Sequence, residues 1–198
     1  VYLDGRLERN WQRTLAGGEQ VTINWPQGGV RRFYQIDPAR ILYRDRFLLA
    51  YNKEPGILSQ PVPADAYNNL YAAVQRFLQK QSSKPYAALH HRQETSGVMV
   101  FAVDRASNRK LSDAFQARAV VKDYLAWVAG CPAQDHWIAT DDISRKAGRY
   151  ATVPTGQGKP AETVFQVLVR EAEQTLVWAR PKTGRTHQIR LHLAAGGH

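Results

Sequence analysis

The chain has 198 residues, 43% hydrophobic and 22% charged, which is enough for one hydrophobic core with at most a small appendage. We expect no transmembrane helix and no signal peptide, because no run approaches 18 apolar residues and the first ten lack an apolar region. The single cysteine, Cys131, excludes an intramolecular disulfide and a cysteine-built metal site, so a cytoplasmic protein is expected. The net charge of +10 leaves two classes open, a nucleic-acid-binding protein and a basic protein without a polyanionic partner.

Residues 1–30 predict a small, basic, β-rich piece that is too short for a hydrophobic core of its own. Asp4-Gly5 is typical of a hairpin turn, and Gly17-Gly18 precedes an alternating apolar pattern. A linker-like composition places a boundary near residues 26–38. We therefore expect an appendage at 1–30 and a main domain at 31–198.

The main domain shows the patterns of alternating strands and helices. The helix predicted at residues 68–81 carries Leu70, Val74 and Leu78 on one face. A second helix is predicted at 105–118. Strands are predicted within 40–56, 97–104, 120–130 and 162–180. Because strands outnumber helices and their links are mostly short, we predict an α+β fold with a mostly antiparallel mixed sheet.

A dense group of cations lies near the C-terminal end, in a segment that is a candidate helix. It contains Arg185, His187, Arg190 and His192, interleaved with apolar residues. Two interpretations stay open: an exposed basic helix, or an arginine held inward beside an anion. The apolar neighbours of these cations predict that at least one of them is partly buried, which would require a hydrogen-bonding or anionic partner.

The histidines and the Thr-Ser-Gly turn do not form a recognisable metal or nucleophile site. His90 and His91 are adjacent, and His187 and His192 are five residues apart, so neither pair has the spacing of a helical zinc site. Ser96 lacks the flanking glycines of a nucleophile elbow. We expect no metal.

Four stretches, in sequence order, together resemble the RluA-type pseudouridine synthases: 41–61, 122–130, 158–168 and 183–193. The last reads Thr-Gly-Arg-Thr-His-Gln-Ile-Arg and is the most specific of the four. Residues 1–25 resemble the second half of an S4-type RNA-binding domain. By this resemblance the appendage is a partial S4-like piece, and the main domain is a synthase catalytic domain that is incomplete at its C-terminal end.

The resemblance implies an antiparallel-rich α+β sheet with a central RNA-binding cleft. It also implies a reaction that breaks the N-glycosidic bond of a uridine, turns the base and rejoins it through carbon. The base must leave its stack to be reached, and an aspartate acts as nucleophile or deprotonates the sugar. No cofactor is implied. The implied partner is structured RNA, ribosomal or transfer, with no membrane contact, and the basic charge suits it.

The resemblance assigns roles to individual residues. Tyr124 matches the tyrosine that packs on the target base, and Arg190 matches the arginine that pairs with the catalytic carboxylate. Arg92 matches an arginine that can fill the place of the extruded base. The full set of expected RNA-contacting residues is His91, Arg92, Lys53, Lys122, Arg185 and His187.

The catalytic aspartate itself is missing. The family motif is His-Arg-Leu-Asp-x-x-Thr-Ser-Gly, whereas this sequence runs from Arg92 directly to Gln93. An alignment with a gap between these two residues retains the most matches and lacks only the Leu-Asp pair. Without the gap, the aspartate position falls on Arg92, which would place like charges together with Arg190.

Three explanations stay open for the absent Leu-Asp pair. The natural molecule carries the pair and this sequence omits it; the pair is deleted and the protein binds RNA without catalysis; or another carboxylate serves. For the third, Glu94 is the nearest, followed by Asp104 and Asp123. The first two correspond to two functions, an active RNA pseudouridine synthase and an inactive RNA-binding protein on the same fold.

Overall fold

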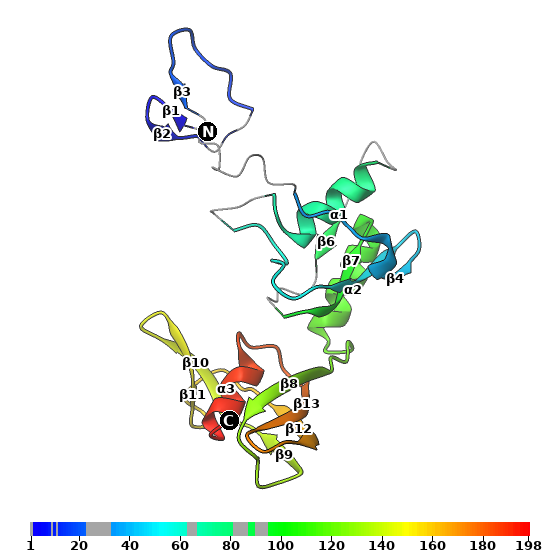
Figure 1. Ribbon diagram of the computed structural model, residues 1–198, viewed down its shortest axis with the longest axis vertical. Coiled ribbons are helices and arrows are strands. Elements are labelled where there is room, and N and C mark those ends of the chain that lie inside the picture. Colours follow the sequence, from blue (N-terminus) through cyan, green and yellow to red (C-terminus); the bar gives the residue numbers. More distant parts are fainter. Residues whose placement is uncertain are drawn as a thin grey trace. The chain divides into compact units, whose positions relative to one another are not determined.

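The computed structural model describes the chain except for residues 1, 9, 11, 23–32, 63–66, 81–86 and 90–94. It divides into two compact units, Val1–Ser107 and Asn108–His198. All strand pairs within its sheets are antiparallel, and three α-helices accompany them in the described part of the chain (Figure 1). The predicted α+β class is confirmed. None of the described helices is long and apolar enough to cross a membrane.

The N-terminal piece of the first unit is a three-stranded sheet in the order β2-β1-β3, built from β1 (Tyr2–Leu3), β2 (Arg6–Leu7) and β3 (Val21–Thr22). The turn between β1 and β2 is the predicted Asp4-Gly5, with φ angles of 47° and 77°. A two-residue turn with both φ values positive favours this residue pair. The S4-like assignment and the domain boundary stay predictions.

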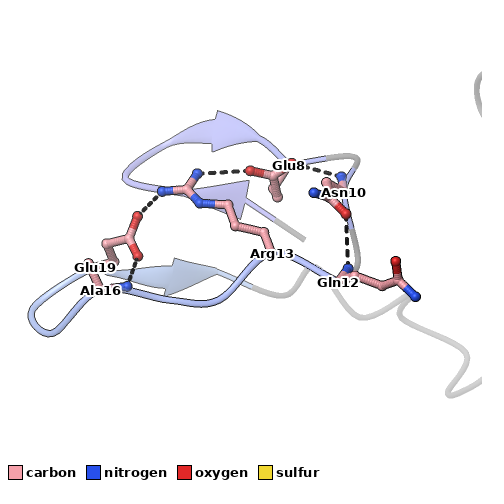
Figure 2. Close-up of polar contacts among 6 residues, drawn as sticks. All are labelled: Glu8, Asn10, Gln12, Arg13, Ala16 and Glu19. Atoms are coloured by element: carbon pink, nitrogen blue, oxygen red, sulfur yellow. Dashed lines mark hydrogen bonds and ion pairs between the residues drawn. The ribbon is translucent and has the colours of Figure 1, made fainter.

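One arginine organises the loop between β2 and β3 (Figure 2). Nη1 of Arg13 donates to Oε2 of Glu8 at 2.8 Å, and its Nη2 donates to Glu19. The two carboxylates also accept from the backbone, Glu8 from the amide of Asn10 at 2.7 Å and Glu19 from that of Ala16 at 2.6 Å. Among the described residues, the loop is therefore held by a cation between two anions.

The main body of the first unit is a four-stranded sheet in the order β4-β5-β7-β6, built from β4 (Ile41–Arg44), β5 (Leu48–Lys53), β6 (Ala88–Leu89) and β7 (Gly97–Ala102). A short 3-10 helix, Pro38–Arg40, precedes it. Helix α1 (Leu70–Gln79) begins at Asn69, whose side chain accepts from the amide of Ala72. Its buried Leu70, Val74 and Leu78 join the sheet residues in one core, which confirms the predicted helix face.

Helix α2 (Arg105–Gln116) runs across the boundary between the units. The second unit then forms a four-stranded sheet in the order β8-β13-β12-β9, from β8 (Tyr124–Ala129), β9 (His136–Ala139), β12 (Thr163–Arg170) and β13 (Gln174–Pro181). A hairpin of β10 (Asp142–Lys146) and β11 (Arg149–Val153) stands beside it, and α3 (Gln188–Ala195) ends the unit (Figure 1). The core is Val128, Phe165, Val177, Ala179 and Leu193.

The two faces of this second sheet differ. Phe165, Val177 and Ala179 are fully buried on the face that α3 covers. The opposite face leaves apolar side chains exposed, including Leu125, Trp127 and Ile138. The alternation along the strands therefore assigns each residue to one face.

Candidate active site

Tyr124 lies on the face of the second sheet that α3 covers. Tyr124 stands in a row of directly opposed residues that crosses the sheet. In strand order from β8 to β9 the row is Tyr124, Ala179, Phe165 and Trp137. Residues directly opposite one another in an antiparallel sheet point to the same face. Tyr124 and Ile189 of α3 both pack against the core cluster. The predicted base-stacking tyrosine and the helix that carries Arg190 thus share one face.

Arg190 lies on the outer side of α3. Its side chain is exposed, and it has no hydrogen bond or ion pair with any residue that the structure describes. In α3, Arg190 is therefore not held inward beside an anion. Gln188 and His192, four residues apart, occupy the inner positions instead and are 4% and 2% exposed. The buried member of the cation group is His192.

The segment before α3 is fixed by backbone and side-chain contacts. The hydroxyl of Thr183 accepts from the amide of Glu162 at 3.0 Å, and Nε of Arg185 donates to the carbonyl of Pro160 at 2.9 Å. His187 is exposed and has a left-handed backbone with φ of 56°, so it turns the chain into the helix without a side-chain cap. Its ring lies edge-on to Tyr150 of β11, with centroids 6.2 Å apart.

The Gly-Lys-Pro-Ala-Glu-Thr stretch has a structural explanation at three positions. A Cβ on Gly158 would lie 2.8 Å from Cγ2 of Val153 and 3.0 Å from the carbonyl oxygen of Ile143, so a side chain does not fit there. Lys159 and Ile143 exchange backbone hydrogen bonds, each 3.0 Å long. Thr163 is fully buried and bonds to α3 residues. This stretch and the 183–193 segment are therefore locked to each other.

Comparison with known proteins decides the family. A family model described as "RNA pseudouridylate synthase" matches residues 47–195. The chain belongs to this RNA pseudouridylate synthase family. The predicted resemblance is confirmed.

Curated relatives agree with this family. The Dual-specificity RNA pseudouridine synthase RluA of Yersinia pestis is 36% identical over 165 residues, covering 80% of this chain and 77% of the relative. The Ribosomal large subunit pseudouridine synthase D of Escherichia coli O157:H7 is 29% identical over 202 residues, covering 98% of this chain and 60% of the relative. An uncharacterized RNA pseudouridine synthase of Aquifex aeolicus is 31% identical, and the chain spans 66% of its length. The chain thus covers less than two thirds of the length of several of its relatives.

The fold also agrees with solved structures of RNA pseudouridylate synthase domains. Human RNA Pseudouridylate Synthase Domain Containing 4 superposes with a TM-score of 0.67 at 26% identity, covering 80% of this chain and 64% of that one. Human RNA Pseudouridylate Synthase Domain Containing 1 gives a TM-score of 0.65 at 25% identity, with 80% of this chain covered and 65% of that one.

Within this pseudouridylate synthase chain, the junction where the family aspartate is expected lies outside the described residues. The same holds for His91, Arg92 and Glu94. Their predicted roles therefore stay predictions.

Two carboxylates that the sequence offers as substitutes for the absent aspartate, Asp104 and Asp123, already bind other groups. Asp104 caps α2, accepting from the amides of Ala106 at 2.8 Å and Ser107 at 2.9 Å. Asp123 binds Arg180, which lies on the sheet face opposite to Tyr124. Neither position favours a role as the missing nucleophile.

The two lysines assigned to RNA differ in environment. Lys53 is 1% exposed, and its ammonium donates to the carbonyls of Ile57 at 2.6 Å and Glu54 at 3.2 Å, a placement that favours turn stabilisation. Lys122 is half-buried and has no ion pair with a described residue. Burial lowers the pKa of its ammonium, and the positive charge of Arg118 lowers it further. An anion next to Lys122 would raise this pKa again, because a nearby negative charge favours the charged form of the ammonium.

Proposed function

We propose that this chain is an RNA pseudouridine synthase that isomerises specific uridines in ribosomal or transfer RNA, in the cytoplasm. The observation that carries the proposal is that Tyr124 and the helix bearing Arg190 lie on one face of the second sheet. Two of the four motif segments, 158–168 and 183–193, bond to each other beside this face. A flipped base needs an aromatic ring to stack on, and the nucleophilic carboxylate needs a cation.

The proposed reaction requires no external reagent. The bond between the uridine nitrogen and the ribose carbon breaks, the base turns, and a ring carbon of the base bonds to the same ribose carbon. The proton on that ring carbon moves to the released nitrogen, so that atoms balance. An aspartate at the Arg92–Gln93 junction would act as nucleophile or deprotonate the sugar. Arg190, exposed and unpaired among the described residues, supports this role because a guanidinium binds a carboxylate bidentately.

Cations on the described surface support an RNA partner. Arg145 and Arg149 are exposed on the β10–β11 hairpin, and Arg145 lies 5.6 Å from the ring centre of Tyr150. Lys122 and Arg185 add positive charge elsewhere in the second unit. These groups suit phosphate binding, which is stronger at low salt.

The decisive experiment concerns the Arg92–Gln93 junction. The peptide that spans Ala88–Ala102 is sequenced by mass spectrometry, and a variant with Leu-Asp inserted at the junction is made. We expect the inserted chain to form pseudouridine in ribosomal or transfer RNA transcripts, and the chain without the pair to form none while still binding RNA. Binding without turnover in both chains would support the inactive alternative; turnover without the inserted pair would contradict the assignment of the nucleophile.

A further inference from the structure

A continuous chain of hydrogen bonds runs through the second unit from Glu162 to Asp141. We call it the polar relay and define it by Thr183, Gln188, Thr163 and His192. We propose that Thr163, Gln188 and His192 are positioning residues that fix the rotation of α3 and so aim Arg190. The proposal rests on the proposed function, because it concerns the same site.

The amide of Gln188 makes all four of its hydrogen bonds. Its Oε1 accepts from the hydroxyl of Thr183 at 2.7 Å and from the backbone amide of Arg185 at 3.0 Å. Its Nε2 donates to the carbonyl of Glu162 and to the hydroxyl of Thr163, both at 2.9 Å. Because one partner is a backbone donor and another a backbone acceptor, the amide has one possible orientation.

The same logic fixes the ring of His192. Its Nε2 lies 3.0 Å from the carbonyl oxygen of Asp141, which only accepts, so Nε2 carries the hydrogen. Its Nδ1 lies 3.0 Å from the hydroxyl of Thr163. In the neutral ring Nδ1 is then the acceptor, and Thr163 donates its only hydrogen to it. Every hydrogen in the relay has an assigned acceptor, which makes the inner surface of α3 specific for one arrangement.

The relay decides which side of α3 faces outward. A helix turns about 100° per residue, so Arg190 lies about 200° from Gln188, on the far side from the relay. Apolar packing constrains this rotation from one side only, because Ile189 and Leu193, four residues apart, pack against the core whereas Leu191 lies away from them. Leu191 is only half-buried, whereas His192 and Leu193 are buried. The hydrogen bonds of the relay are directional, so they add to this apolar contact and fix the rotation in which Arg190 is exposed.

The first test is spectroscopic and needs no activity. The ring nitrogens of His192 are observed by two-dimensional NMR of the ¹⁵N-labelled full chain, with assignment from a His192→Gln variant. We expect the neutral Nε2–H tautomer. An Nδ1–H tautomer or a ring that averages between the two would overturn the relay, whatever the function of the protein.

The second test measures positioning in the chain with Leu-Asp inserted between Arg92 and Gln93. Thr163→Val keeps the shape of the side chain and removes the hydroxyl, whereas Thr163→Ser keeps the hydroxyl and is the matched control. At saturating RNA we expect the single-turnover rate of Thr163→Val to fall about 100-fold, the order of effect of a 1 Å misplacement. RNA affinity should be unchanged in both variants, and Thr163→Ser should retain most of the single-turnover rate of the parent.

The outcomes separate the two proposals. If the chain with Leu-Asp inserted shows no turnover, the proposed function is contradicted. The polar relay is then still tested by the tautomer of His192, which does not depend on activity. If the chain with Leu-Asp inserted is active and a folded Thr163→Val variant of it is equally fast, the positioning role is contradicted. If Thr163→Val does not fold, Thr183→Val, which removes one acceptor contact of Gln188, takes its place with the same expectations.

Discussion

Asp123 and Arg180 form a bidentate ion pair on the face of the second sheet opposite to Tyr124. Nε of Arg180 lies 2.8 Å from Oδ1 of Asp123, and its Nη2 lies 3.0 Å from Oδ2. We therefore expect Asp123→Asn to leave the turnover of the Leu-Asp-inserted chain unchanged, measured as single-turnover pseudouridine formation. Loss of turnover in a folded Asp123→Asn variant that still binds RNA would make Asp123 the reacting carboxylate.

The same pair predicts a pH dependence of stability. The hydrogen bond from Arg180 holds the pKa of the Asp123 carboxyl below its ordinary value of about 3.9. A group whose pKa is lowered by folding stabilises the fold above its unfolded pKa, and that stabilisation is lost as the pH falls through the folded pKa. The melting temperature of the parent should exceed that of Asp123→Asn at neutral pH, and the difference should vanish on acidification below about pH 4. A difference that persists at the acid end would show that packing, not charge, is responsible.

Gly158→Ala should destabilise the second unit. Its Cβ would meet Cγ2 of Val153 at 2.8 Å and the backbone of Ile143 at 3.0 Å, and overpacking of this kind costs about 1–3 kcal/mol. Urea unfolding measures the loss. Gly184→Ala is the matched control, because its Cβ would have no atom within 4 Å and its φ is ordinary. Equal stability of the two variants would mean that the hairpin relaxes around the added methyl group.

Lys122→Met should weaken RNA binding in a salt-dependent way. If its ammonium neutralises one phosphate, the slope of log affinity against log salt should become shallower by about 0.7–0.9. Titrations at several salt concentrations measure this slope. Arg170→Met is the control, because Arg170 is exposed but already paired with Asp135 at 2.5 Å. If the slope of log affinity against log salt is the same for Lys122→Met as for the parent, Lys122 does not contact a phosphate, whatever the change in affinity itself.

Arg190→Ala should abolish turnover in the Leu-Asp-inserted chain while leaving the melting temperature unchanged. The side chain is exposed and makes no hydrogen bond or ion pair with a described residue, so its removal should cost little stability. Removing it would leave the carboxylate without its cation in the complex with RNA. Arg190→Lys should recover part of the rate, because a lysine restores the charge but not the bidentate geometry. Parent-like turnover of Arg190→Ala would show that Arg190 was assigned wrongly.

The local patterns predicted the main elements well where one face is apolar. The helical spacing of Leu70, Val74 and Leu78 placed α1 to within two residues at each end. The β10–β11 hairpin was not predicted, because its strands carry few apolar residues and lack a clear apolar alternation. A turn signal is present in Ala147-Gly148, both with positive φ, but a single glycine is weak evidence alone.

The direction of Arg190 could not be read from its neighbours. Ile189, Leu191 and Leu193 alternate with the cations, which suggested an arginine surrounded by apolar groups. Polar residues, Gln188 and His192, are in fact buried beside Leu193, and both bond to Thr163, which lies far away in the sequence. Burial of such side chains depends on those distant partners, and no local pattern contains them.

The polar relay also constrains the order of folding. Three of its bonds join residues 25, 29 and 51 positions apart in the chain. A helix of eight residues is not stable in isolation, so α3 depends on β12 and on the segment around Asp141 being in place. Contacts so distant in sequence form late, since their loop-closure entropy must be overcome first. We expect α3 to be among the last elements to acquire amide-exchange protection, so that a partly folded chain does not yet present Arg190 in its final orientation.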